Sequence, residues 1–173
     1  RNPTVPDQYI KLNVGPIIIL GGAPENSRGL NAYENSVDAS SLGAFFGGFQ
    51  QDLQSGVPFP QAVINNKDRL VKSNVPYIKP EQSKSFEIGY KGLISRKLLI
   101  DVNYYFSSFT DFLINQVVAR PNSPVLGPDG KINPDAAFDI VGGKRQLFQL
   151  YTNASDEVTS QGATLGITYS LPK

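Results

Sequence analysis

A strict alternation of apolar and polar side chains in the middle of the chain constrains its fold more than any other feature. Phe86, Ile88 and Tyr90 alternate with polar or small residues, and after a short polar break the alternation resumes from Leu98 to Phe106. A period of two residues is typical of a β-strand, and the short break predicts a hairpin. One face of this hairpin is aliphatic and aromatic. The other carries charges, amides and glycine, which would be costly to bury in a dry core.

Two environments fit a sheet with one apolar and one polar face. In a soluble antiparallel sheet the apolar face packs on a core and the polar face meets solvent. In an outer-membrane barrel the apolar face meets lipid, the polar face lines a wet lumen, and short turns at one edge alternate with long loops at the other. The order of the predicted elements favours the barrel. Tyr90 and Tyr169 also fall near strand ends on the apolar face, where an aromatic girdle would lie.

The composition removes most common enzyme and metal sites. The 173-residue chain has no Cys and no His, so thiol nucleophiles, His-dependent catalysis and zinc fingers are excluded. Its net charge of +1 offers no basic stripe for nucleic acid. The acidic residues after Pro128 lack the spacing of a calcium loop. We therefore expect no enzyme, and we predict no catalytic, cofactor-binding or metal-ligating residue.

The chain divides into predicted strands, loops and helices. Three segments with a two-residue period are predicted strands: 79–94, 97–117 and 147–171. Two segments rich in turn-forming residues are predicted extracellular loops: 1–78 and 118–146. Within the first loop, apolar residues recurring at three and four positions predict two helices: about 36–55 and 59–72. From its first and last residues, we expect the chain to be an internal piece of a longer protein.

The alternation also assigns side chains to faces. The predicted lipid-facing residues are Phe86, Ile88, Tyr90, Ile100, Val102, Tyr104, Phe106, Leu165, Ile167 and Tyr169. The predicted lumen-facing residues are Glu87, Lys91, Asp101, Asn103, Thr164 and Thr168. The predicted buried core of the first helix, which would form a lid, is Phe45, Phe46 and Phe49.

Several short stretches of the sequence resemble a known family. They are Arg1–Thr4, Asp7–Ile10, Tyr77–Gln82, Ser85–Gly92 and Thr159–Ala163. The most specific is the element that joins Lys79–Pro80–Glu81 to Ser85–Gly92. Together these stretches resemble the later barrel strands of TonB-dependent outer-membrane receptors, most closely the Bacteroidetes type, and the resemblance covers nearly the whole chain.

This resemblance implies a fold, a location and partners. We expect an all-β membrane protein in which residues 1–173 are a fragment of a large antiparallel transmembrane β-barrel. The fragment would supply about three of about 22 strands, with long extracellular loops, one of which carries two short helices. The implied location is the outer membrane of a bacterial cell. The implied partners are outer-membrane lipid, the rest of the barrel and its plug domain, and TonB, which would act through an N-terminal region missing from this sequence. A surface lipoprotein of the SusD-like type is left open, and no nucleic acid is expected.

Three hypotheses for function remain at this stage. The leading one is a segment of a TonB-dependent receptor that imports a scarce nutrient through a plugged barrel. The second is a structural or adhesive outer-membrane barrel without active transport. The third is a soluble carbohydrate-binding β-domain. The loop residues suit a siderophore, an oligosaccharide or a peptide equally, and substrate contacts are expected from the two long loops.

Overall fold

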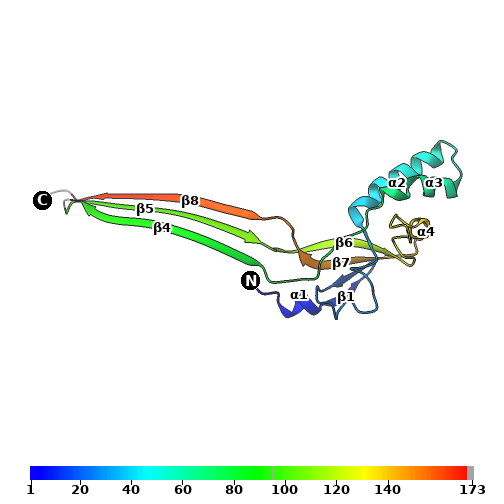
Figure 1. The fold of residues 1–173 in the computed structure, drawn as a ribbon, viewed down its shortest axis with the longest axis horizontal. Coiled ribbons are helices and arrows are strands. Elements are labelled where there is room, and N and C mark those ends of the chain that lie inside the picture. The colour runs from blue at the N-terminus through cyan, green and yellow to red at the C-terminus, as the bar shows by residue number, and fades with distance from the viewer. Residues whose placement is uncertain (95, 171–173) are drawn as a thin grey trace. The chain divides into compact units, whose positions relative to one another are not determined.

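The computed structural model describes residues 1–94 and 96–170, which divide into two compact units (Figure 1). The three-stranded unit contains Arg1, Pro80–Phe112 and the chain from Ala154 onward. The five-stranded unit contains Asn2–Lys79 and Leu113–Asn153. The structure is mostly β, and neither of its two sheets closes into a barrel within this chain. None of the described helices is long and apolar enough to cross a membrane.

The elements run in the following order along the chain. The helices are α1 (Val5–Tyr9), α2 (Ala39–Gln54), α3 (Phe59–Asn66) and α4 (Pro134–Val141), with a 3-10 turn η1 (Lys67–Arg69). The strands are β1 (Lys11–Val14), β2 (Ile17–Leu20), β3 (Val37–Asp38), β4 (Gln82–Ile94), β5 (Leu98–Thr110), β6 (Leu113–Pro121), β7 (Arg145–Asn153) and β8 (Val158–Tyr169).

The three-stranded unit is an antiparallel sheet in the order β4-β5-β8. The predicted hairpin is confirmed, because Ser85–Ile94 pairs antiparallel with Leu98–Ser107. β5 also pairs antiparallel with β8, from Leu98 to Phe109. These three strands of 12 or 13 residues are the longest in the chain.

Two of the predicted strands were wrong in extent, because each is divided between the two sheets. The predicted strand 97–117 is interrupted at Asp111, whose φ of 59° takes the backbone out of the extended region. The predicted strand 147–171 is divided by the polar residues 154–157, which separate β7 from β8. The predicted end at Leu171 lies outside the described residues. The predicted strand 79–94 begins later, at Gln82.

The five-stranded unit corrects the prediction that 1–78 and 118–146 are largely irregular loops. Its sheet has the order β1-β2-β7-β6-β3. β2 pairs parallel with β7, and the other pairs are antiparallel. Strands β1, β2 and β3 are only two to four residues long, too short to show a period. β2 and β3 form because β7 and β6, with which they pair, lie 80 or more residues later in the chain and offer them a sheet edge, and β1 pairs with β2.

Both predicted helices of the first loop are present, with different ends. α2 begins at Ala39 and not at residue 36, because Val37 and Asp38 pair with β6. The side chain of Asn35, just before this pairing, accepts a hydrogen bond from the Val125 backbone N–H at 2.7 Å. α3 ends at Asn66 and is followed by η1, so the predicted end at residue 72 is six residues too late.

Helix α4 was missed because its first residues are also turn formers. Asn133 is the N-cap, and its side chain accepts from the Asp135 backbone N–H at 3.0 Å. Pro134 occupies the first turn, where its missing N–H costs nothing. Three side chains of the helix are buried: Ala136, Ala137 and Ile140. Part of the segment predicted as the loop 118–146 is therefore a packed helix.

Two apolar clusters lie on opposite faces of the five-stranded sheet. Helices α2, α3 and α4 cover one face around Ala119, and segments 30–33 and 75–77 cover the other around Phe148. Of the three phenylalanines predicted to form the helix core, Phe45 and Phe49 are buried and Phe46 is half-buried. Phe46 is also covered by Arg145, whose guanidinium carbon lies 5.6 Å from the ring centroid.

Candidate functional site

The register of the three-stranded sheet fixes which of its side chains share a face. Phe86 lies opposite Phe106, Tyr90 lies opposite Val102, and Val102 lies opposite Leu165. All ten predicted lipid-facing residues fall on this one face, together with Ile94 and Leu98, and we call it the apolar face. No core covers it among the described residues.

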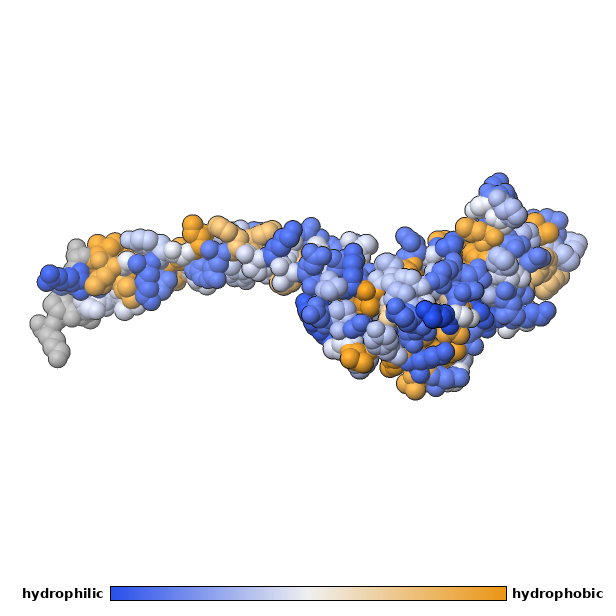
Figure 2. Space-filling model, turned by 60° about the horizontal axis from the view of Figure 1, so that its bottom comes forward, coloured by the Kyte–Doolittle hydropathy of each residue, from blue (hydrophilic) through white to orange (hydrophobic). Residues whose placement is uncertain are grey.

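The apolar face is strongly exposed for such large side chains. Leu165 keeps 66% of its surface exposed, Tyr90 64% and Ile88 60%. In the space-filling view, apolar residues stand on the surface between hydrophilic ones (Figure 2). An exposed face with this many large apolar side chains marks contact with another protein or with a membrane.

The length of the apolar face along its strands is that of a membrane-spanning strand. Its side chains extend along β5 from Leu98 to Phe106. At about 3.3 Å per residue this is about 26 Å measured along the strand. A tilted transmembrane β-strand crosses the hydrocarbon with about 9–11 residues.

The opposite face of the same sheet is polar. The Lys91 Nζ lies 3.1 Å from the Asp101 Oδ2, and the Asn103 amide donates a hydrogen bond to Glu87. Thr164 lies opposite Asn103 in the register, and all six predicted lumen-facing residues fall on this face. Some polar side chains of this face therefore form ion pairs or hydrogen bonds with one another.

Tyr105 was not predicted as a feature of the polar face. Its ring lies against Gly162 on the neighbouring strand, and a Cβ at Gly162 would come within 2.6 Å of the ring. Glycine at this position therefore allows the ring to lie flat on the sheet. The sequence signal that could have indicated this contact was the tyrosine Tyr105 at a position of the polar face, with Gly162 on the neighbouring strand.

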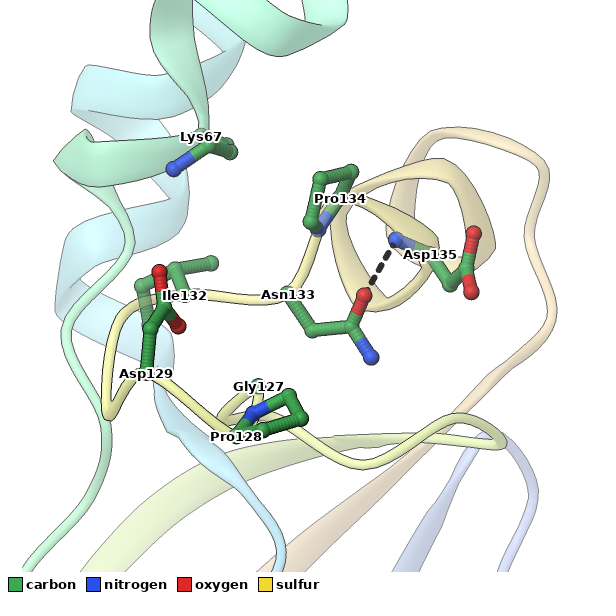
Figure 3. A pocket seen from close by; sticks show the side chains of 8 residues that line it. All are labelled: Lys67, Gly127, Pro128, Asp129, Ile132, Asn133, Pro134 and Asp135. Atoms are coloured by element: carbon green, nitrogen blue, oxygen red, sulfur yellow. Dashed lines mark hydrogen bonds between the residues drawn. The ribbon is translucent and has the colours of Figure 1, made fainter.

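The five-stranded unit contains an open cleft of about 540 Å³ (Figure 3). It lies between η1, the start of α4 and the turn that connects β6 to α4. Its lining residues are Lys67, Gly127, Pro128, Asp129, Ile132, Asn133, Pro134 and Asp135. None of these was singled out as a binding residue from the sequence.

The rim of the cleft is held by a short turn. The Gly127 backbone N–H donates to the Lys131 carbonyl at 2.8 Å, and the Asn133 N–H donates to the Val125 carbonyl at 2.9 Å. Gly130 has a φ of 75°, which glycine adopts without strain. The cleft is therefore bordered by a folded turn.

The cleft itself is polar at its edges and apolar at its walls. Lys67 is engaged with Asp68, its Nζ 2.7 Å from that carboxylate. The Asp135 carboxylate points away from Lys67 (Figure 3). Among the described residues, no group of three or more acidic, His or Cys side chains could hold a metal ion. The walls and the carboxylate edges could receive a small polar molecule.

A pair of tyrosines joins distant segments of the five-stranded unit. The ring centroids of Tyr33 and Tyr77 are 4.6 Å apart. The Tyr33 hydroxyl donates to the Tyr151 carbonyl at 2.7 Å, and the Tyr77 hydroxyl donates to Glu34. Burial raises the pKa of Tyr33 far above its usual range, and the nearby Tyr77 and Glu34 add to this effect. Burial, followed by the hydrogen bond to Glu34, also raises the pKa of Tyr77.

These tyrosines should make the five-stranded unit sensitive to alkali. A raised folded-state pKa means that the unfolded chain loses its phenol protons first. The stability supplied by the neutral phenols is therefore complete below a pH of about 10 and falls as the pH rises above it. Replacing Tyr33 by phenylalanine should cost about 1 kcal/mol at neutral pH, through the lost bond to Tyr151, and should weaken the alkaline dependence. Limited proteolysis of the intact protein across an alkaline pH series would measure both effects. An unchanged pH dependence in the variant would contradict this account.

Comparison with known proteins identifies the class of protein. A family model described as "TonB dependent receptor-like, beta-barrel" matches residues 29–171, which include the whole three-stranded sheet and most of the five-stranded unit. The chain therefore belongs to the TonB-dependent receptor β-barrel family. Neither the curated proteins nor the solved structures gave a match.

Membership of this family defines the general role. The family consists of bacterial outer-membrane receptors and transporters, in which a large barrel surrounds a plug and interacts with TonB. The predicted resemblance to TonB-dependent receptors is thereby confirmed at the level of the family. The two open sheets of this chain are consistent with a part of such a barrel.

Proposed function

We propose that this chain forms part of the wall and part of the extracellular head of a receptor that imports a scarce nutrient. The observation that carries the proposal is the exposed apolar face of the three-stranded sheet, about 26 Å long when measured along its strands, backed by a polar face. A closed soluble core would cover such a face, whereas lipid leaves it uncovered by protein. Strands β4, β5 and β8 would then be three neighbouring strands of the barrel.

The two faces then acquire different environments. The apolar face, including Ile88, Val102 and Leu165, would contact the hydrocarbon of the outer membrane. The polar face, including Glu87, Lys91 and Asp101, would meet water or the plug domain of the intact receptor. The pair between Lys91 and Asp101 supports this assignment, because neutralised charges are tolerable beside a plug.

The five-stranded unit would be the head that meets the substrate outside the cell. Binding surfaces concentrate on segments held by a rigid scaffold, and this unit has two apolar clusters of its own. Its cleft beside Asp129 and Asn133 is a concave surface of this unit with polar edges. Substrate contacts would therefore come from packed surfaces. A siderophore, an oligosaccharide or a peptide remains the proposed range of nutrients.

The partners and the subfamily follow from the resemblance seen in the sequence. The stretch Ser85–Gly92, preceded by Lys79–Pro80–Glu81, supports a receptor of the Bacteroidetes type. For such a receptor a surface lipoprotein of the SusD-like kind is a proposed partner of the head. Outer-membrane lipid, the remaining barrel strands, the plug and TonB complete the proposed set.

The two other hypotheses are weaker after the fold is known. A soluble carbohydrate-binding domain would leave the side chains of Ile88, Tyr90 and Leu165 in water at 60% exposure or more. A structural or adhesive barrel would use the same strands, and it differs from a transporter in lacking a plug and a TonB-binding segment. The experiment must therefore measure transport.

Uptake in the source bacterium tests the proposed function. A strain lacking the receptor gene and a strain lacking TonB would each be supplied with iron bound to siderophores, with oligosaccharides or with peptides as the limiting nutrient. We expect both strains to lose uptake of the same nutrient class, and the intact gene to restore it in the first strain. Normal uptake of every class in the receptor mutant would favour the structural or adhesive barrel.

A further inference from the structure

The charges of the three-stranded sheet are divided unequally between its faces. Strands β4, β5 and β8 carry two acidic side chains, Glu87 and Asp101, and both lie on the polar face. The apolar face carries a single charge, which is the ammonium of Lys84. Lys84 is exposed, and no carboxylate lies within salt-bridge distance of it among the described residues.

Lys84 lies where the apolar side chains of its face end. In the register it is opposite Ser108, and Ser108 is opposite Thr159. This row comes directly after the row that contains Phe86 and Phe106. The last positions of the same face are all polar, and we call them the polar rim: Gln82, Lys84, Ser108, Thr110, Thr159 and Gln161.

Several polar groups of the rim already have partners. The Gln82 amide donates to Asp111 at 3.2 Å, and Gln161 accepts from the Tyr104 hydroxyl at 3.0 Å. The Ser108 hydroxyl donates to Glu157, which precedes β8. Lys84 is therefore the cation of the rim that is free for an outside partner, with Thr159 in the same row.

Positive charge also flanks the other end of the apolar face. The turn between β4 and β5 carries Arg96 and Lys97, next to the row of Ile94 and Leu98. An apolar belt about 26 Å long when measured along its strands, with cations at both ends, has the charge pattern that two layers of lipid phosphates would stabilise. Long basic side chains at such positions reach out of the hydrocarbon to the headgroups.

We propose that Lys84 binds the phosphate of a bilayer lipid headgroup at the polar rim. The position of Lys84 at the end of the belt favours an anionic headgroup. The carboxylates of Asp111 and Glu157 would oppose the contact, because they accept hydrogen bonds from Gln82 and Ser108 of the same rim. The proposal rests on the lipid-facing assignment of the apolar face made above.

Lipid retention by the intact receptor tests this inference. The receptor would be purified in a neutral detergent and titrated with phosphatidylglycerol, and bound lipid would be counted by native mass spectrometry. Lys84→Gln should weaken binding of one lipid about fivefold, since one basic residue near a charged surface contributes about 1 kcal/mol. Lys84→Arg should restore it. Lys91→Gln, on the same strand but on the other face, is the matched control and should leave binding unchanged.

Further measurements distinguish a lipid headgroup from free inorganic phosphate as the bound group. Inorganic phosphate should not displace the lipid, because a free anion lacks the acyl chains that lie on the belt. Glu157→Gln should bind the lipid as well as the unmodified receptor or better. Equal losses in Lys84→Gln and Lys91→Gln, or displacement by inorganic phosphate, would overturn the inference. Failure of the lipid-facing assignment is detected separately by the probe at Val102 described in the Discussion.

Discussion

Replacing Phe45 by alanine should destabilise the five-stranded unit by about 3–5 kcal/mol, the usual cost of truncating a buried phenylalanine. Phe45 has no exposed surface and lies 6.4 Å from the ring centroid of Phe49 in a stacked arrangement. It packs α2 onto the cluster that contains Val37 and Ala119. The cavity would remove contacts from the helices and the sheet together, so the loss should appear as faster hydrogen exchange across α2 of the intact receptor.

Phe59→Ala is the matched control for this prediction. Phe59 lies in the same helical hairpin and makes an edge contact to Phe49 with centroids 5.5 Å apart, but 48% of its surface is exposed. Its truncation should therefore cost much less than that of Phe45. Equal effects of the two substitutions would mean that α2 and α3 do not pack as described.

Replacing Val102 by arginine should destabilise the intact barrel by about 2–4 kcal/mol, as an arginine near mid-membrane on the lipid face does. Val102 lies in the middle row of the apolar face, between Tyr90 and Leu165. The expectation that Tyr90 lies near a strand end, in an aromatic girdle, is therefore wrong, because its register partner is at the middle of the face. A guanidinium at this depth would have to leave water or distort the bilayer. Urea unfolding of the receptor from lipid vesicles would measure the loss.

Thr164→Arg is the control for the change at Val102. Thr164 is next to Leu165 on β8, but it belongs to the polar face opposite Asn103. An arginine there would reach water, so the loss should be well below that of Val102→Arg. If both variants were equally stable, the two faces would not have the environments assigned to them.

The sequence predicts the three-stranded sheet well because its information is local. Thirteen-residue strands such as β4 repeat the apolar and polar alternation often enough to define both faces, and the short turn at Arg96 fixes the hairpin register. The face assignments of Phe86, Val102 and Glu87 follow from that register. Their contact with lipid or lumen remains a prediction.

The five-stranded unit could not be predicted in the same way, because its strands pair with segments that are distant in the sequence. β2 is four residues long and forms only because β7, more than 120 residues later in the chain, pairs with it in parallel. Asn133 and Pro134 suggest a turn when taken alone. In the structure they begin α4, whose residue Ile140 is buried against other parts of the unit. The cleft beside them was missed because it depends on how η1 and α4 pack.

The central claim is that β4, β5 and β8 have one face in lipid, and depth-dependent quenching tests it most directly. The chain has no cysteine, so a fluorescent label can be attached to a single cysteine introduced at Val102 or at Asn103, its neighbour on the opposite face. The intact receptor would be reconstituted into vesicles whose lipids carry bromine near the middle of the acyl chains. The label at Val102 should be strongly quenched and the label at Asn103 should not. Equal quenching at the two positions, or quenching only at Asn103, would contradict the account.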